Sequence, residues 1–405
     1  METKLDSQST VLLPPDPPGP MKWIRDNLFG SVSNTILTII SLTLFYFMIT
    51  SAASWVLFSA DWRPVTESPL LYAIGQYPRD QMWRVGLALS LAVLMFGVSW
   101  GKWNGMLRSI SIGLMVVFGA AALLPVSHPQ FDLSMRLYLG GNVLIVFAGF
   151  FIGRIKGLKT LVITMAWLMV PILAVILFSG FEGLDWLERV ATTSWGGLMV
   201  TFLLAVGGIL LSFPLGVLLA LGRRSKLPVV KGFSVIWIET IRGVPLITIL
   251  FMFSIILALF LPQESRLDRL LRALMAVVVF SSAYTAENVR GGLQSVPEGQ
   301  IEAAKALGMN SFRTMGLIVL PQAIRAVIPA IVGQFISLFK DTTLVVIIGI
   351  NDFLGIGKSI INSQPAFVQL QTEVYIFIAA VYWIFSYLMS IASRRVEETL
   401  GVGDR

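Results

Sequence analysis

Charged side chains interrupt apolar stretches at two places in the second half of the chain. Glu239 and Arg242 stand three residues apart, and Lys340, Asp341 and Thr342 are consecutive. A charge within a membrane-crossing helix is costly and needs a partner, so these residues mark either the path of a polar solute or a structural ion pair. Glu239 and Arg242 share one face of a helix, which predicts that they pair with each other.

Lys340 and Asp341 cannot pair in this way, because adjacent residues point to different sides of a helix. We expect either partners on another helix or a break in the helix at this point. A polar lining suited to a zwitterionic solute and a structural ion pair between helices both remain open. Gly243 and Pro245 weaken the helix after Arg242, which would free backbone groups for a solute.

The sequence offers no set of residues for covalent, metal or nucleotide chemistry. It has no cysteine, and its one histidine, His128, stands between prolines in a predicted loop. The triplet from Gly357 to Ser359 resembles the end of a phosphate-binding loop, but Asp352 occupies the position that requires the first glycine. We therefore expect no catalytic residue, no metal ligand and no cofactor, and we predict that the chain is not an enzyme.

The composition is that of a polytopic membrane protein built only of helices. Of the 405 residues, 56% are hydrophobic and 13% are charged, whereas soluble domains carry about 25% charged residues. The net charge of +7 fits basic membrane loops better than a nucleic-acid surface. Apolar runs long enough to cross a bilayer predict ten spans, at about 31–58, 84–101, 109–126, 137–153, 160–180, 194–222, 233–261, 270–291, 326–350 and 371–393.

These spans must position the charged residues, and their layout predicts three regions. Residues 1–30 are proline-rich and form a disordered cytoplasmic tail, 31–190 form a membrane region of about five helices, and 191–405 form a second membrane domain. Segment 181–193 separates the two halves. With the N-terminus inside, the inner segments hold roughly twice as many Lys and Arg residues as the outer ones, which places the loop 295–325 in the cytoplasm.

That loop contains Glu302, Ala303 and Ala304, followed by Gly308 and, after nine more residues, by Ile318-Val319-Leu320-Pro321. Ser295 and Glu298 have the spacing of a capping box, which predicts the start of a short helix there. Gly308 is a natural helix stop. The stretch 284–292 leads into the loop and ends in two glycines, where we expect either a hinge or an ordinary polar helix end.

The arrangement EAA-x3-G-x9-I-x-LP resembles the coupling loop of ABC importer permeases, and residues 191–405 resemble their type-1 transmembrane domain. With the stretches around Glu239, Tyr284 and Lys340, the chain is similar to the polar amino acid branch, in particular to permeases of the general L-amino-acid uptake systems of Gram-negative bacteria. The first half matches by layout only. Such importers usually have five or six spans, so the five extra ones have no assigned role.

The resemblance implies a permease subunit that translocates L-amino acids across the bacterial inner membrane. Glu302, Ala303, Ala304 and Gly308 would contact a separate ATP-hydrolysing subunit, and Glu239, Arg242, Lys340, Asp341 and Thr342 would lie near the pathway. The implied partners are that ATP-binding cassette subunit, a second and different permease chain, a periplasmic amino-acid-binding protein and the bilayer. The alternatives are a secondary transporter of small polar solutes driven by an ion gradient, a membrane enzyme and a structural scaffold.

Overall fold

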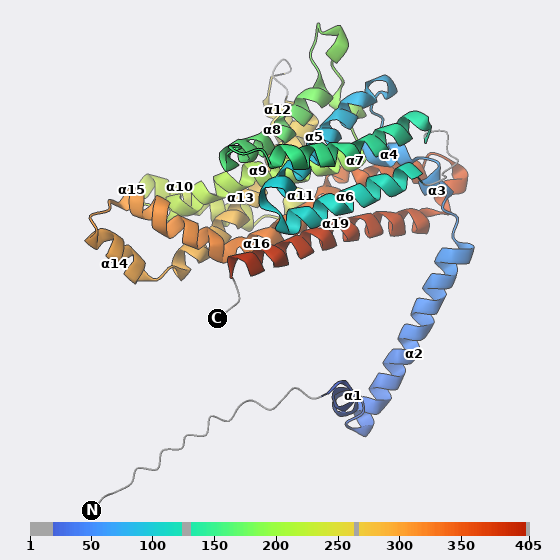
Figure 1. Cartoon of the computed structure of the whole chain (residues 1–405), viewed down its shortest axis with the longest axis horizontal. Helices are drawn as coiled ribbons and strands as arrows, with labels where there is room; N and C mark the ends of the chain where they lie inside the picture. The colour runs from blue at the N-terminus through green and yellow to red at the C-terminus, as the bar shows by residue number, and fades with distance from the viewer. Residues whose placement is uncertain (1–18, 124–130, 263–266, 402–405) are drawn as a thin grey trace, which may run out of the picture. The chain divides into compact units, whose positions relative to one another are not determined.

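The computed structural model describes residues 19–123, 131–262 and 267–401 (Figure 1). The described residues form helices, and the β contacts among them are isolated bridges. The predicted all-α class is therefore confirmed. The chain divides into two compact units, Met1–Asp61 and Trp62–Arg405, which are described separately. The predicted boundary near residue 190 falls within the second unit and stays a prediction. Most of the expected tail and the loop around His128 lie outside the described residues.

The first unit consists of α1 (Pro20–Leu28) and α2 (Val32–Ser54), which continues into the π-helical turn η1 (Trp55–Ser59). The Ser31 side chain accepts the backbone N–H of Asn34 at 3.1 Å and so caps α2. The Thr38 hydroxyl donates to the Leu28 carbonyl at 2.9 Å and ties the two helices together. No residue of α2 is buried, and Val32–Ser59 is long and apolar enough to cross a membrane, as predicted.

Four long helices make up the first part of the second unit. Two of them, α5 and α7, approach each other through glycines. A Cβ atom on Gly97 would lie 2.3 Å from the Val146 carbonyl oxygen, and one on Gly149 would lie 2.4 Å from that of Leu94. Close backbone contact of this kind is the usual way in which helices pack within a membrane. The elements are α3 (Arg63–Thr66), α4 (Pro69–Ile74), η2 (Arg79–Gln81), α5 (Met82–Trp103), α6 (Gly105–Leu123), α7 (Leu133–Gly153) and α8 (Thr160–Ser179).

The second part of this unit is a bundle around α9 and α13, with α16 and α19 alongside (Figure 1). Its elements are η3 (Asp185–Leu187), η4 (Thr192–Ser194), α9 (Gly197–Arg223), α10 (Pro228–Arg242), α11 (Leu246–Phe251), η5 (Met252–Ile256), α12 (Leu257–Phe260), α13 (Arg269–Ser295), α14 (Glu298–Ala306), α15 (Ser311–Thr314), η7 (Met315–Val319), α16 (Leu320–Asp341), η8 (Thr342–Ile348), α17 (Phe353–Ile361), α18 (Pro365–Val368) and α19 (Gln371–Leu400).

The predicted span 233–261 is not one straight helix. Its two pieces, Pro228–Arg242 and Leu246–Phe260, meet at an angle of 108°. The break falls at Gly243 and Pro245, and proline has no N–H to continue the helix. In its described residues, the structure has nine helices that are long and apolar enough to cross a membrane, or ten if the bent pair counts as one span. The predicted number of spans is therefore confirmed.

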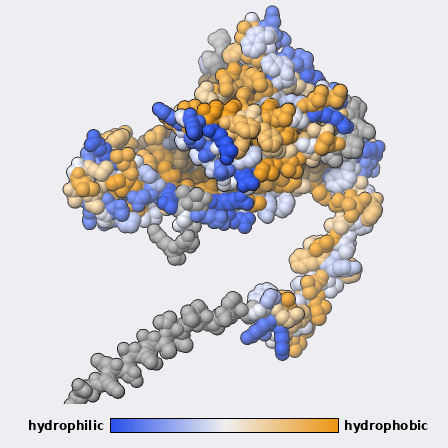
Figure 2. Space-filling view, viewed as in Figure 1, coloured by the Kyte–Doolittle hydropathy of each residue, from blue (hydrophilic) through white to orange (hydrophobic). Residues whose placement is uncertain are grey.

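Apolar side chains cover much of the visible face of the second unit, as expected for helices that face lipid (Figure 2). Several short helices between the spans were not predicted, and α17 is the most buried of them. It carries the triplet from Gly357 to Ser359. A Cβ atom on Gly357 would lie 2.3 Å from a side-chain carbon of Ile378, so this glycine serves helix packing and not a phosphate loop.

The glycine contact gives a first testable prediction. Changing Gly149 to Ala places a methyl group against the Leu94 carbonyl, so the helices must separate, and we expect a loss of about 1–3 kcal/mol in stability. Gly141→Ala on the same helix is the control, because a Cβ atom there meets nothing within 4 Å. Thermal unfolding of the two purified variants in detergent measures the difference. Equal stability would contradict the proposed role of the close α5–α7 approach.

Candidate functional site

A cluster of charged side chains joins α9, α10 and α13, and its centre is Glu287. The Nε atom of Arg290 donates to both carboxylate oxygens of Glu287 at 3.0 Å. One Nη1 atom each from Arg223 and Arg242 lies 3.6 Å from the Oε2 atom of the same carboxylate. Three arginines on three helices thus share one acceptor, and this holds the ends of these helices together.

Glu239 pairs with Arg223 at 2.7 Å. The predicted pair between Glu239 and Arg242 is therefore wrong, because each side chain reaches a different helix. The break after Arg242 ends α10 beside α9 and α13, where partners of opposite charge are available. The structure brings these two residues into one cluster through Glu287 and Arg223, and their place near a pathway stays a prediction.

The cluster holds three arginines and two glutamates, so its formal charge is positive. Arg242 is about one-third exposed and lies over the ring of Tyr284 at 5.9 Å. A partly exposed guanidinium with an incomplete set of acceptors can bind a carboxylate. The sequence analysis singled out Glu239 and Arg242 and, through the polar stretch 284–292, the region of Glu287 and Arg290, but it offered no signal for Arg223.

A second polar region, a seam between α13 and α16, has Gln334 at its centre. The Gln334 side-chain amide donates to the Ser281 carbonyl at 2.8 Å and to the Thr285 hydroxyl at 3.1 Å. Its oxygen accepts the side-chain amide of Asn288 at 2.8 Å. The Ser212 hydroxyl on α9 also donates a hydrogen bond to the Ser281 hydroxyl at 3.2 Å. All hydrogen-bonding groups of Gln334 are therefore used within the helix bundle, and the sequence analysis did not single out this residue.

Lys340, Asp341 and Thr342 lie apart from both regions. The α-helical geometry of α16 ends at Asp341 and the chain continues directly as the 3₁₀ helix η8 within one helical span, Ser311–Ile348, so the helix changes its geometry here but is not broken. Thr342 is buried and donates to the Phe339 carbonyl at 2.8 Å. Within the described ranges, neither Lys340 nor Asp341 forms an ion pair with another helix. Lys340 is exposed, and Asp341 is half-buried.

A buried carboxyl group, Asp352, follows η8 and was considered in the sequence only as an argument against a phosphate loop. It is fully buried. Its side chain caps α17 by accepting the Gly355 N–H at 2.9 Å and accepts the Tyr382 hydroxyl at 3.0 Å. Burial raises the pKa of Asp352 to about 6, although these hydrogen bonds act in the opposite direction. This carboxyl ties the start of α17 to α19.

The loop after α13 forms the expected short helix, α14, at one end of the second unit (Figure 1). Gly308 adopts a φ of +76°. The Met309 N–H donates to the Ala304 carbonyl at 3.1 Å and the Gly308 N–H to the Lys305 carbonyl at 2.9 Å. These two bonds form the Schellman arrangement that ends a helix at glycine, so the predicted stop at Gly308 is confirmed.

The start of α14 differs from the prediction. Ser295 is the last residue of α13 and its hydroxyl donates to the Gly292 carbonyl at 2.9 Å, so it does not cap α14. Pro297 precedes the first residue of α14, Glu298, without a side-chain cap. The capping box is therefore wrong, because α13 extends through the serine that the box requires.

The loop exposes most of the residues that the sequence singled out. Glu302, Ala303 and Gly308 are exposed, whereas Ala304 is 1% exposed and packs inside the loop. Pro321 lies in the first turn of α16. Three large apolar side chains are also exposed here: Leu307, Phe312 and Leu317. Exposed apolar groups next to charged ones are typical of a surface that binds another protein.

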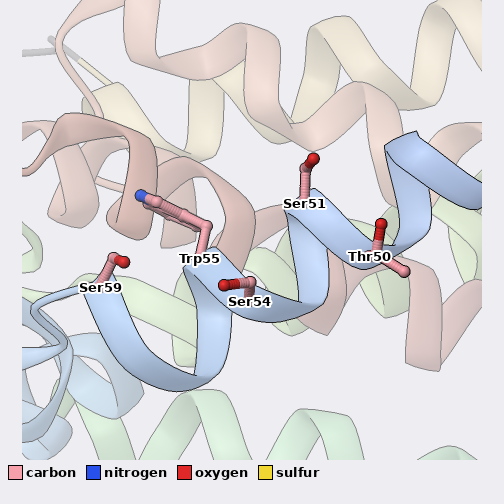
Figure 3. A pocket seen from close by; sticks show the side chains of 5 residues that line it. All are labelled: Thr50, Ser51, Ser54, Trp55 and Ser59. Carbon is pink, nitrogen blue, oxygen red and sulfur yellow. The ribbon is translucent and has the colours of Figure 1, made fainter.

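Two other kinds of candidate site, a hollow in the first unit and a metal site, do not support a function. An open hollow in the first unit is lined by Thr50, Ser51, Ser54, Trp55 and Ser59, whose side chains are drawn in Figure 3. All five belong to α2 and η1, and no other element described in this unit closes the hollow, so we assign no ligand to it. Across residues 19–123, 131–262 and 267–401, no group of three or more His, Cys, Asp or Glu side chains could hold a metal ion.

Asp352 gives a prediction for the pH dependence of stability. Because its pKa is raised in the folded protein, its protonated form stabilises the fold, and this stabilisation is lost as the pH rises through about 6. Lowering the pH from about 7.5 to about 5 should therefore stabilise the protein relative to Asp352→Asn by about 1 kcal/mol. Asparagine keeps a capping side chain. Melting temperatures of both proteins across this range provide the measurement.

Asp132→Asn is the matched control, because Asp132 is also a helix cap. Hydrogen bonds from the Met135 N–H and from Ser134 lower its pKa, and it is exposed. The stability that ionised Asp132 contributes is present at pH values above its usual pKa. It is lost only as the pH falls through the lowered pKa. We expect no pH-dependent difference for this variant between about pH 7.5 and pH 5. A difference like that of Asp352→Asn would rule out the effect of burial.

Comparisons with known proteins identify the family of this chain. Residues 212–401 match the family model described as "Binding-protein-dependent transport system inner membrane component". The inner membrane amino-acid ABC transporter permease protein YhdY of Escherichia coli is 38% identical over 399 residues, which cover 95% of this chain and 94% of that protein. The glutamate/glutamine/aspartate/asparagine transport system permease protein BztC of Rhodobacter capsulatus is 34% identical over 415 residues, 94% of each chain.

Among solved structures, a crystal structure of an amino acid ABC transporter with histidines is 30% identical, at a TM-score of 0.46, and the match covers 50% of this chain and 92% of that one. The two permeases from Escherichia coli and Rhodobacter capsulatus match over both halves of the chain, and the family model matches the half that holds the charge cluster and the loop. The chain belongs to the family of inner membrane components of binding-protein-dependent transport systems.

Proposed function

We propose that this chain is a permease subunit of an ATP-driven, binding-protein-dependent system that takes up L-amino acids across the bacterial inner membrane. The observation that carries this proposal is the match over nearly the full length to amino-acid permeases, in a chain with nine or ten apolar spans in its described residues. ATP hydrolysis belongs to a separate subunit in this proposal, because the sequence offers no nucleotide site of its own.

The loop α14–α15 is the proposed docking site for that subunit, through Glu302, Ala303 and Gly308. Ala304 packs within the loop and holds its shape. Leu307 and Phe312 are 81% and 87% exposed and add apolar surface that a partner can cover. The loop continues directly from α13 and leads through η7 into α16. A displacement of the loop therefore acts on both helices that form the polar seam.

The Glu287 cluster is the proposed polar part of the pathway. It contains Glu239 and Arg242, and Glu287 lies on α13, eight residues before the end of that helix. The α-carboxylate of an amino acid is a suitable ligand for Arg242, because the cluster has one more arginine than glutamate. Lys340, Asp341 and Thr342 belong to a separate part of the pathway in this proposal, at the end of α16.

The proposed partners complete the transport system. They are an ATP-binding subunit, a second permease chain and a periplasmic protein that delivers the amino acid. Two relatives from Bacillus subtilis, the probable glutamine ABC transporter permease proteins GlnP and GlnM, are 37% and 33% identical over half of this chain. Two such permeases in one organism support a pair of different permease chains here.

The loop predicts a difference between two adjacent alanines. The chain has no cysteine, so Ala303→Cys and Ala304→Cys each introduce a single thiol. Ala303 is exposed and Ala304 is buried, so only the first should cross-link efficiently to the ATP-binding subunit, and the yield should change with ATP. Gel analysis of the purified complex measures the yield. No link from Ala303, or equal yields from both positions, would contradict the proposed docking surface.

A second prediction concerns Glu287. Replacing it by Gln leaves three arginines without their shared carboxylate, and loss of one partner in such a group is strongly destabilising. We expect amino-acid uptake into proteoliposomes, with the complete transport system, to fall about ten-fold or more. Glu182→Gln is the control, since Glu182 also pairs with an arginine, Arg189, but in an exposed loop.

ATP and an ion gradient are supplied separately in these assays. Uptake that needs the gradient and not ATP would favour a secondary transporter instead. Unchanged uptake by the folded Glu287→Gln protein would place the pathway elsewhere while leaving the ATP-driven function intact.

A further inference from the structure

A cavity of about 590 Å³ opens in the second unit, and nothing in the proposed transport function uses it. One wall comes from the segment 65–73 before the long helices, the other comes from α9, α17 and α19, and Phe131, just before α7, completes the lining. It thus lies where the N-terminal part of this unit meets the part matched by the family model. The lining residues are Val65, Thr66, Glu67, Pro69, Tyr72, Ala73, Phe131, Leu198, Phe353, Phe377 and Val381.

Most of this lining is apolar. Phe353 and Phe377 lie 5.8 Å apart between ring centres, and Tyr72 lies 5.6 Å and 5.1 Å from them. Leu198, Phe377 and Val381 belong to α9 and α19, both of which are long and apolar enough to cross a membrane. The medium next to these helices is lipid, so an apolar chain can enter between them at little cost.

Tyr72 provides one buried polar group in the wall. Its side chain is 3% exposed, and its hydroxyl has no hydrogen-bond partner among the described residues. A buried hydroxyl without a partner is destabilising by about 1–3 kcal/mol. The lining therefore lacks a hydrogen-bond acceptor for the Tyr72 O–H, and a ligand in the cavity can supply it.

Glu67 and Thr66 are the exposed members of the lining. The Thr66 hydroxyl already donates to the Trp62 carbonyl at 3.2 Å. Glu67 forms no ion pair within the part of the chain that the structure describes. A carboxylate without a cationic partner at the edge of an apolar cavity favours a positively charged group nearby.

We propose that this cavity binds one phospholipid with an amine head group. The three kinds of lining group each have a complement in such a molecule. The acyl chain packs among the phenylalanines, an ester carbonyl accepts the Tyr72 O–H, and the ammonium group lies beside Glu67. A soluble polar solute would leave the apolar walls unmatched, and an anionic lipid would bring its negative charge to Glu67. The bound lipid joins the two parts of the second unit.

The first test measures lipid retention. The full-length chain, in its transporter complex, is reconstituted with equal amounts of phosphatidylethanolamine and phosphatidylglycerol, extracted in mild detergent and examined by native mass spectrometry. We expect wild type to retain one phosphatidylethanolamine. Val381→Trp, which fills the cavity, should lose it, whereas Val117→Trp on the exposed face of α6 should keep it. Glu67→Gln should bind both lipids equally.

The second test addresses the hydrogen bond of Tyr72. Diester and diether phosphatidylethanolamine differ in that only the diester has carbonyl oxygens. Wild type should retain the diester form about two- to ten-fold better, the range expected for one hydrogen bond, and Tyr72→Phe should remove this preference. Phenylalanine keeps the ring that packs against Phe353 and Phe377, so the fold should be unaffected.

Three results would overturn the proposal. The first is retention of lipid by Val381→Trp at the wild-type level, which would place the bound molecule elsewhere. The second is a preference of wild type for phosphatidylglycerol. The third is loss of lipid from Val381→Trp and Val117→Trp alike, which would show only a general annular layer. None of these results bears on whether uptake requires ATP, so the transport proposal is tested independently.

Discussion

The arrangement of the transport half depends on one carboxylate shared by three arginines. An arginine next to membrane-crossing helices is costly to keep without an acceptor, and Arg223, Arg242 and Arg290 all lie within reach of Glu287 or Glu239. This requirement fixes the ends of α9, α10 and α13 relative to one another. It also explains why α10 can stop short at a sharp bend, since its last residues are held by charges from its neighbours.

The same helix, α13, carries both Glu287 and the start of the loop that we assign to the ATP-binding subunit. Upstream, Ser281 and Thr285 of this helix bond to Gln334 of α16. The loop is therefore connected to the charge cluster through one continuous helix and to α16 through η7. The loop is thus joined to the bundle by α13 on one side and by η7 and α16 on the other, and both connections lead to polar groups within the bundle.

Patterns local in sequence were predictable, and pairings between distant residues were not. The ten spans and the glycine stop at Gly308 follow from apolar run length and from glycine's tolerance of positive φ. The pairing of Glu239 with Arg223 could not be predicted, because it depends on how two helices meet. Ser295 was misassigned for a similar reason, since tertiary packing lets α13 run one turn further than local signals indicate. The cavity near Tyr72 needs residues from five elements, and no sequence pattern connects them.

The contact between α5 and α7 has a consequence for motion. Gly97 and Gly149 bring backbone against backbone, with no side chain between them that could change rotamer. Such an interface cannot slide by small steps, because each step would drive a carbonyl into the opposing chain. These two helices must therefore travel as one rigid body during a transport cycle. Any relative movement between the N-terminal helices and the remainder of the unit has to take place at softer, side-chain-filled boundaries.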